Sequence, residues 1–147
     1  MAEENLKTLS ILAFDFGTTR IGIAYGQTAT MTTMPLAEIS AQDGIPSWEI
    51  VASYVKEWKP NGLLIGLPIN MDGTENEMCQ RARKFAKRLH GRFGLPAWLW
   101  DERLSSREAR ERIERSGKKR YVIDSVAAEA ILESWFENGC PKERSCP

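Results

Sequence analysis

The chain has 147 residues, of which 42% are hydrophobic and 27% charged, so it fits one globular domain rather than a disordered chain. Its 20 basic residues balance 20 acidic ones, so any attraction for a polyanion must come from local patches. The three cysteines form no even disulfide set, the polar start is not a signal peptide, and no apolar run reaches the ~20 residues that span a bilayer. We expect a single cytoplasmic domain over 1–147, with a core at about 9–138, loose tails at 1–8 and 139–147, and no membrane partner.

Three strands are expected to open the domain. The apolar runs Leu9–Phe14 and Ile21–Gln27 flank Gly-Thr-Thr-Arg and predict a β-hairpin. Met31–Ile39 predicts a third strand, in which Pro35 requires an edge or a bulge because proline cannot donate to a strand ladder.

Helices and strands alternate through the rest of the chain. The expected elements are a helix capped by Ser47, a buried strand Leu63–Leu67, a long helix opened by a Thr74–Glu77 capping box and ending near Phe93, a strand Ala97–Trp100, a helix opened by a Ser105–Glu108 capping box, and a last helix Asp124–Asn138 capped by Gly139. This order predicts an α/β fold with a mixed five-stranded sheet, three strands antiparallel and the later ones parallel, and helices on both faces. Trp98 and Trp100 share one strand face and are expected in the core.

The first strand ends in an acid, Asp15, which interrupts an apolar run directly before Gly-Thr-Thr-Arg. An unpaired charge is costly inside a core, so this carboxyl group is expected to be paired, protonated, bound to a metal or at the solvent end of the strand. An aspartate that bonds the amides of its own turn is an equally good alternative.

Acids also stand at the end of a later strand and at the start of the last helix. Asp101 and Glu102 follow the strand at 97–100, and pleat alternation turns one of them toward the edge of Asp15, without deciding which. Pairing with a neighbouring arginine is the alternative. Asp124 shares the apolar face of the last helix, where a plain N-cap is the alternative.

These three acidic positions can converge at one edge of the sheet. Converging carboxylates repel one another unless divalent cations are present, and oxygen ligands suit Mg²⁺ or Mn²⁺. Two such ions ~3.5 to 4 Å apart can activate a water and stabilise the leaving oxygen in phosphodiester cleavage. No histidine is needed, and His90, in a basic helix, is expected at the surface.

Five segments of the chain resemble the YqgF/RuvX family, in the family order and over about residues 9–138. They are FDFGTTRIGIAYGQ, GLPINMDGTEN, RARKFAKRLHGRFG, DERLSSREA and IDSVAAEAILESWF. The resemblance implies an RNase H-like fold and a metal-dependent nuclease that matures the 5′ end of pre-16S ribosomal RNA or resolves Holliday junctions. It implies that Asp15, Glu102 and Asp124 are the catalytic, metal-binding acids, with Asp101 as an alternate ligand, and that Mg²⁺ or Mn²⁺ is the cofactor, as two ions.

Several basic and polar residues are candidates for substrate contact. The loop before Asp124 is shorter than the glycine- and lysine-rich loop usual in the family, yet it supplies three consecutive basic residues that would hold phosphates. The candidate substrate-binding residues are Arg20, Asn70, Arg103, Lys118, Lys119 and Arg120. Arg20 paired with an acid, and Asn70 in a plain turn, remain alternatives. The basic residues at 81–92 are spread around the long helix and are expected to be a plain solvated surface.

Two other functions compete with a nuclease. Asp-Phe-Gly-Thr-Thr also resembles the first phosphate-binding loop of the superfamily of actin and the sugar kinases, but that superfamily needs two such domains and an adenosine-binding segment. A module that holds structured nucleic acid without cutting it is the second alternative. We predict a nuclease whose partner is nucleic acid, with pre-16S RNA and ribosomal precursor particles preferred over a DNA junction on the resemblance alone.

Overall fold

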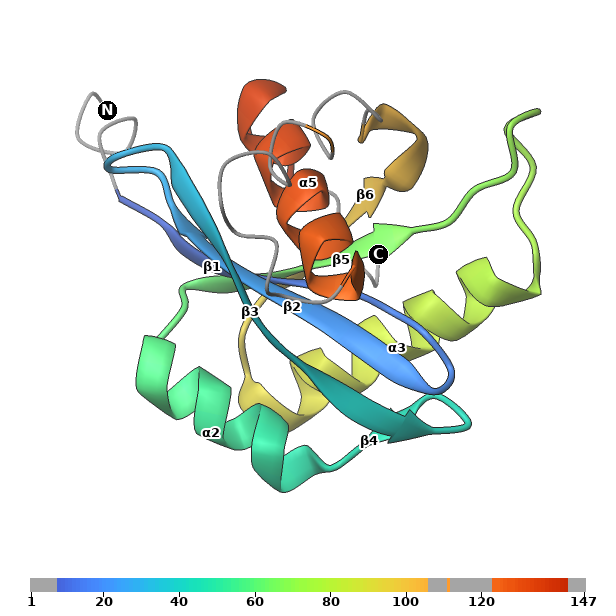
Figure 1. The fold of residues 1–147 in the computed structure, drawn as a ribbon, viewed down its shortest axis with the longest axis horizontal. Coiled ribbons are helices and arrows are strands. Elements are labelled where there is room, and N and C mark those ends of the chain that lie inside the picture. Colours follow the sequence, from blue (N-terminus) through green and yellow to red (C-terminus); the bar gives the residue numbers. More distant parts are fainter. Residues whose placement is uncertain (1–7, 106–110, 112–122, 143–147) are drawn as a thin grey trace.

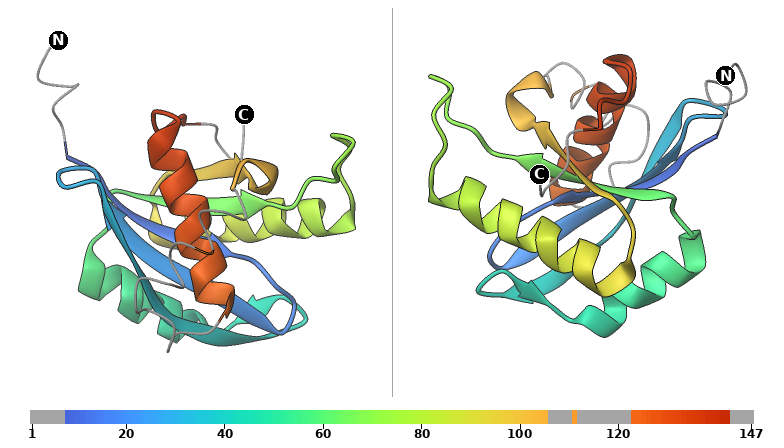
Figure 2. Two further views of the ribbon diagram at one scale, coloured as in Figure 1. Left: turned by 45° about the horizontal axis from the view of Figure 1, so that its top comes forward. Right: turned by 180° about the vertical axis from the view of Figure 1, so that it is seen from behind.

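The computed structural model describes residues 8–105, 111 and 123–142, with the backbone alone at 123 and 124. A six-stranded sheet in the order β4-β3-β2-β1-β5-β6 forms its centre, with α5 crossing one face and α2 and α3 covering the other (Figure 1; Figure 2). The elements are β1 (Ser10–Asp15), β2 (Arg20–Gln27), β3 (Thr32–Gln42), β4 (Ile45–Pro46), α2 (Trp48–Trp58), β5 (Gly62–Leu67), α3 (Glu77–Phe93), β6 (Ala97–Asp101), the 3₁₀ helix η1 (Glu102–Leu104) and α5 (Ile123–Glu137). In this part of the chain, no helix is long and apolar enough to cross a bilayer.

The mixed sheet matches the prediction in its strand directions but has one strand more. β1, β2 and β3 are antiparallel neighbours, whereas β5 runs parallel to both β1 and β6. The sixth strand is β4, which pairs only with Ala41 and Gln42 of β3. Two residues are too few for a hydrophobic period, so the sequence carries no signal for β4. Pro35 lies on β3 beyond this pairing, at an open edge, as predicted.

Side-chain alternation divides the core into two layers. Leu12 and Phe14 of β1 pack with α2 and α3, whereas Ile11 and Ala13 pack with α5. All residues of β5 are buried, as the continuous apolar run predicts for a strand covered on both faces. Trp98 and Trp100 lie in the layer under α5, which confirms their predicted core position.

The two long helices have well-defined ends, one of which differs from the prediction. α3 is capped by Asn76, whose side chain accepts a hydrogen bond from Cys79 N at 3.0 Å, so the capping box at Thr74 is wrong. Thr74 instead donates its hydroxyl to Asp72 at 2.6 Å and belongs to the preceding loop. α5 ends at a left-handed Gly139, as predicted. The capping box at 105–108 lies largely outside the described residues.

Candidate active site

The candidate site lies where β1, β5 and β6 end, on the face covered by α5. The parallel register pairs Phe14 with Ile65 and Gly66 with Trp100, so the next residue of β1, Asp15, stands beside Gly66. Asp15 follows the alternation of Ile11 and Ala13 and therefore belongs to the α5 face. It is half-buried at the end of its strand. Asp15 is thus the last residue of its strand, at the end of the sheet, as expected.

Glu102 occupies space that a side chain at Gly66 would fill. A Cβ atom at Gly66 would lie 2.7 Å from Oε2 and 2.9 Å from Cγ of Glu102. The same atom would lie 2.6 Å from Cδ1 of Ile131, which comes from α5. Because Gly66 has no side chain, Glu102 of η1 and Ile131 of α5 can both pack directly on the backbone of β5. The Glu102 carboxylate therefore lies on β5, which is the neighbour of the strand that ends in Asp15.

Asp101 points to the opposite face of the sheet. It alternates with Trp100 and shares a cavity lining with Leu67 and Leu99 on the α3 side. Its carboxylate accepts hydrogen bonds from Arg103 N at 2.9 Å and from Arg103 Nη2 at 2.7 Å. Partial burial raises the pKa of Asp101, but the hydrogen bonds and charge of Arg103 outweigh this, so its pKa lies below the usual range. Of the two adjacent acids, Glu102 is the one that lies over Gly66, on the sheet face to which Asp15 belongs.

The start of α5 is fastened to β2 and β3, next to β1. Ser125 is fully buried, and its hydroxyl donates to the carbonyl of Leu36 at 2.6 Å and accepts from Ile23 N at 3.5 Å. Ile23 pairs with Phe14, the residue before Asp15. The hydrogen bonds of Ser125 thereby hold the first turn of α5, which contains the backbone of residue 124, over β2, the strand next to β1. The side chain of residue 124 lies outside the described residues.

The candidate substrate residues in the described part of the chain contact other protein groups. Arg20 pairs with Glu38 at 3.6 Å and is about two-thirds exposed at 65%. The Asn70 amide donates to Thr74 Oγ1 at 3.1 Å and accepts from Asn76 at 2.7 Å, which supports a structural role. The remaining candidates Lys118, Lys119 and Arg120 lie outside the described residues.

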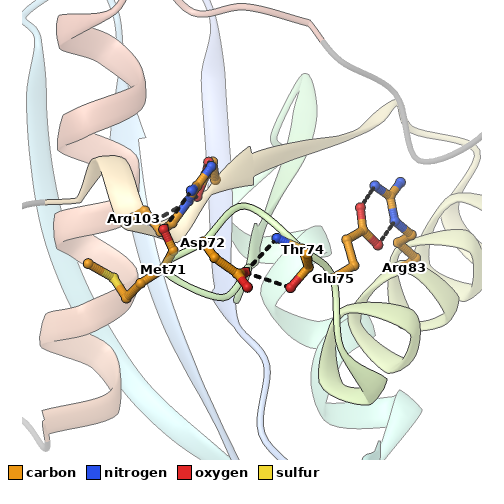
Figure 3. A network of polar contacts seen from close by, with 7 residues as sticks. Met71, Asp72, Thr74, Glu75, Arg83 and Arg103 are labelled. Atoms are coloured by element: carbon orange, nitrogen blue, oxygen red, sulfur yellow. Dashed lines mark hydrogen bonds and ion pairs between the residues drawn. The ribbon is translucent and has the colours of Figure 1, made fainter.

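Arg103 joins η1 to the loop that follows β5 (Figure 3). Besides binding Asp101, it donates from Nη1 to the carbonyl of Met71 at 3.4 Å. In that loop Asp72 accepts from Thr74 N at 3.0 Å, and the hydrogen bonds of Thr74 lower the pKa of Asp72. The loop is thus internally bonded and tied to the segment that carries Glu102. Sequence reasoning missed this tie, and it also missed Gly66, although a lone glycine inside an apolar strand is typical of a close approach.

The two described acids fit a hard divalent cation by their chemistry. Both offer carboxylate oxygens, which Mg²⁺ and Mn²⁺ prefer. The missing side chain at Gly66 leaves room for Glu102 on the sheet face to which Asp15 belongs. Among the described side chains, no group of three or more His, Cys, Asp or Glu is placed to hold an ion, and the third predicted ligand, Asp124, lies outside that set.

A mixed sheet with three antiparallel strands followed by parallel ones, helices on both faces and acids at one edge defines an RNase H-like fold of the nuclease class. A family model described as RuvX, Holliday junction resolvase, matches residues 9–138, so the chain belongs to the RuvX family.

Relatives match the chain over nearly its whole length. A protein of Saccharophagus degradans is 51% identical over 136 residues, which cover 90% of this chain and 96% of the relative. A protein of Escherichia coli O1:K1 is 52% identical over 134 residues, with 88% and 97% covered. Both are named "Putative pre-16S rRNA nuclease". RuvC of T. thermophilus in complex with a Holliday junction substrate has a TM-score of 0.57 at 13% identity, over 91% of this chain and 98% of RuvC, and thus shares the fold.

Proposed function

We propose that this chain is a divalent-metal-dependent nuclease that hydrolyses phosphodiester bonds in structured nucleic acid. The observation that carries the proposal is the position of the Glu102 carboxylate over Gly66, on the sheet face and edge where β1 ends in Asp15. Asp124, in the first turn of α5, is the third acid of the proposed site. Asp101 is the weaker candidate for a ligand because its oxygens bind Arg103 on the other face.

The chain's own residues would hold the metal and fix the geometry. Two Mg²⁺ or Mn²⁺ ions would supply the activation of a water and the stabilisation of the leaving oxygen. Asp15 would bind these ions from the end of β1 and Glu102 from the start of η1, while Ser125 keeps the start of α5 against the sheet. The contact between Arg103 and Asp101 would limit the movement of η1, so that Glu102 stays aimed at the same place.

A ribosomal RNA precursor is the preferred substrate. Relatives about half identical to this chain over nearly their full length carry the name of a pre-16S rRNA nuclease, which favours maturation of the 5′ end of that RNA. Such a substrate would place the activity on ribosomal precursor particles in the cytoplasm. The family description supports the second candidate, resolution of a four-way DNA junction.

Cleavage of both substrates side by side tests the proposal. Labelled pre-16S RNA and a four-way DNA junction are incubated with Mg²⁺, with Mn²⁺ and with chelator. We expect metal-dependent cutting of the RNA that falls more than ~100-fold in Asp15→Asn and Glu102→Gln, because a ligand should matter more than its outer partners. Asp101→Asn changes only the carboxylate that binds Arg103 on the other face, so it should cost clearly less activity than either ligand variant. Cutting of the junction alone would reverse the substrate, and binding without cutting in any metal would refute the enzyme.

A further inference from the structure

A groove of about 660 Å³ lies on the sheet face opposite the acids, between α3 and the turn that joins β3 to β4. Figure 2 shows α3 lying across this face when the molecule is seen from behind. The groove begins at Phe16, the residue after Asp15, and Gly44 of the turn packs so closely on Phe16 that a Cβ there would lie 2.8 Å from its ring. The groove and the candidate active site therefore meet at one edge of the sheet.

The groove is strongly basic although the whole chain has a formal net charge of +0. Its charged lining consists of five basic residues, Arg81, Arg83, Lys84, Lys87 and Arg88, and two acids, Asp43 and Glu77. The field around the groove is therefore a local positive one, which an even overall charge does not predict.

Both acids of the groove pair with the same arginine, whereas three of its cations make no ion pair with a described residue. Arg81 pairs with Asp43 at 3.0 Å and with Glu77 at 3.6 Å. The side chains of Lys84, Lys87 and Arg88 are exposed and make no ion pair with any residue that the structure describes.

Packing explains why these charges gather on one side of α3. The helix buries Cys79, Ala82, Phe85, Ala86 and Leu89 against the sheet, which leaves its basic residues on the outer half. The prediction that these charges are spread around the helix is therefore wrong, since they share its outer half, and the turn between β3 and β4 lies beside them and makes a groove of that surface.

We infer that this groove binds the phosphate backbone of the nucleic acid that extends beyond the active site, an inference that rests on the proposed function. Asp15 and Phe16 are consecutive and face opposite sides of the sheet at the end of β1, so a nucleic-acid strand that continued from the acids around this end would reach the groove. The seven residue-to-residue steps from Arg81 to Arg88 rise about 10 Å along α3, which matches roughly three phosphate-to-phosphate steps at ~3.4 Å each. Such contacts position the substrate without reading its sequence.

Charge also decides between the partners of this groove. A second copy of the chain that packed here groove to groove would bring the unpaired cations of two α3 helices together, and like charges at an interface are unfavourable. A polyanion instead gains one contact from each of them. The groove thus extends the substrate-binding surface to the back of the sheet.

Salt-dependent binding tests the inference without requiring cleavage. The probe is an RNA stem with a single-stranded extension, and its fluorescence anisotropy is titrated in chelator at several salt concentrations. The slope of the logarithm of the association constant K against the logarithm of salt concentration is negative. Lys84→Gln/Arg88→Gln should reduce its magnitude by about 1.4, or ~0.7 for each lost phosphate contact. The charge-preserving Lys84→Arg/Arg88→Lys should keep the slope. The matched control is Lys56→Gln/Lys142→Gln, which removes the same charge at exposed sites outside the groove.

The outcomes separate this inference from the proposed function. A slope that falls in the groove variant alone supports the inference. Equal slopes in the groove variant and the control, with an intact wild-type nuclease, overturn the groove and leave the function standing. A wild type that neither binds nor cuts RNA overturns the function first. Self-association that the groove variant abolishes would assign the groove to a second copy and overturn the inference. Thermal melts of every variant should match the wild type because the changed side chains are exposed.

Discussion

Replacing Gly66 by alanine is the sharpest test of the geometry at the candidate active site. The added Cβ would lie 2.7 Å from Oε2 of Glu102 and 2.6 Å from Cδ1 of Ile131. Ordinary contacts between heavy atoms are ~3.5 to 4.0 Å, so each neighbour must move by about 1 Å. Ile131 is a fully buried residue of α5, whereas Glu102 is only partly buried on η1 and can move more easily.

Two separate losses follow from this crowding. Overpacking costs about 1 to 3 kcal/mol of unfolding free energy, which urea denaturation measures. A displacement of Glu102 by about 1 Å should lower kcat for RNA cleavage ~100-fold, because catalytic geometry tolerates little misplacement. The double variant Gly66→Ala/Ile131→Val removes the Cδ1 contact and should recover part of the stability while activity stays low.

Gly91→Ala is the matched control. Among the described residues no atom lies within 4 Å of the Cβ position at Gly91, on the exposed side of α3. The change should raise stability by about 0.5 to 1 kcal/mol through helix propensity and leave cleavage unchanged. Full activity in Gly66→Ala, or recovery of activity together with stability in the double variant, would refute the role assigned to Glu102.

Three further substitutions test local contacts. Asp101→Asn should cost about 1 kcal/mol at neutral pH, because the carboxylate accepts hydrogen bonds from Arg103. Since the pKa of Asp101 is lowered from 3.8, this cost is complete above that pH and disappears as pH falls through the lower folded value, which urea titrations from neutral to acidic pH follow. Ser125→Ala should lose about 1 to 2 kcal/mol and reduce cleavage, because the carbonyl of Leu36 loses its donor and α5 loosens; a cost confined to stability would argue against the link. Asn76→Ala should lower the thermal midpoint by removing about 1 kcal/mol of N-cap stabilisation from α3, and an unchanged midpoint would contradict that cap.

Much of the fold is encoded in local patterns that a reader of the sequence can find. Alternating and continuous apolar runs predicted β1, β2, β3, β5 and β6, and the all-apolar β5 announced a strand covered on both faces. The short β4 escaped because it forms only where the end of β3 offers a partner. The start of α3 was predicted too early because a threonine can either cap a helix or bond within a loop. Thr74 forms a hydrogen bond with Asp72 in the loop, and the helix is capped by Asn76 instead.

The candidate site depends on contacts that are distant in sequence. The choice between Asp101 and Glu102 requires knowing which face of β6 is covered by α5, and this is set by the stacking of Trp98 on Trp135 at 5.6 Å. Likewise Asp15 stands beside Gly66 only because of the parallel register between β1 and β5. Residue types at element ends thus identified the acids, while their relative placement came from the packing of whole elements.

The burial of β5 also has a consequence for the rate at which backbone amides exchange with deuterium. Its amides are paired on both sides and covered by helices on both faces, so they should exchange with deuterium only when the whole domain unfolds. The segment η1 has few such bonds, and its exposed residues should exchange through small local openings. The proposed site would therefore join a strand whose exchange reports global unfolding to a segment whose exchange reports local opening. Exchange at η1 would therefore report directly how firmly the contact of Arg103 with Asp101 holds the segment that carries Glu102.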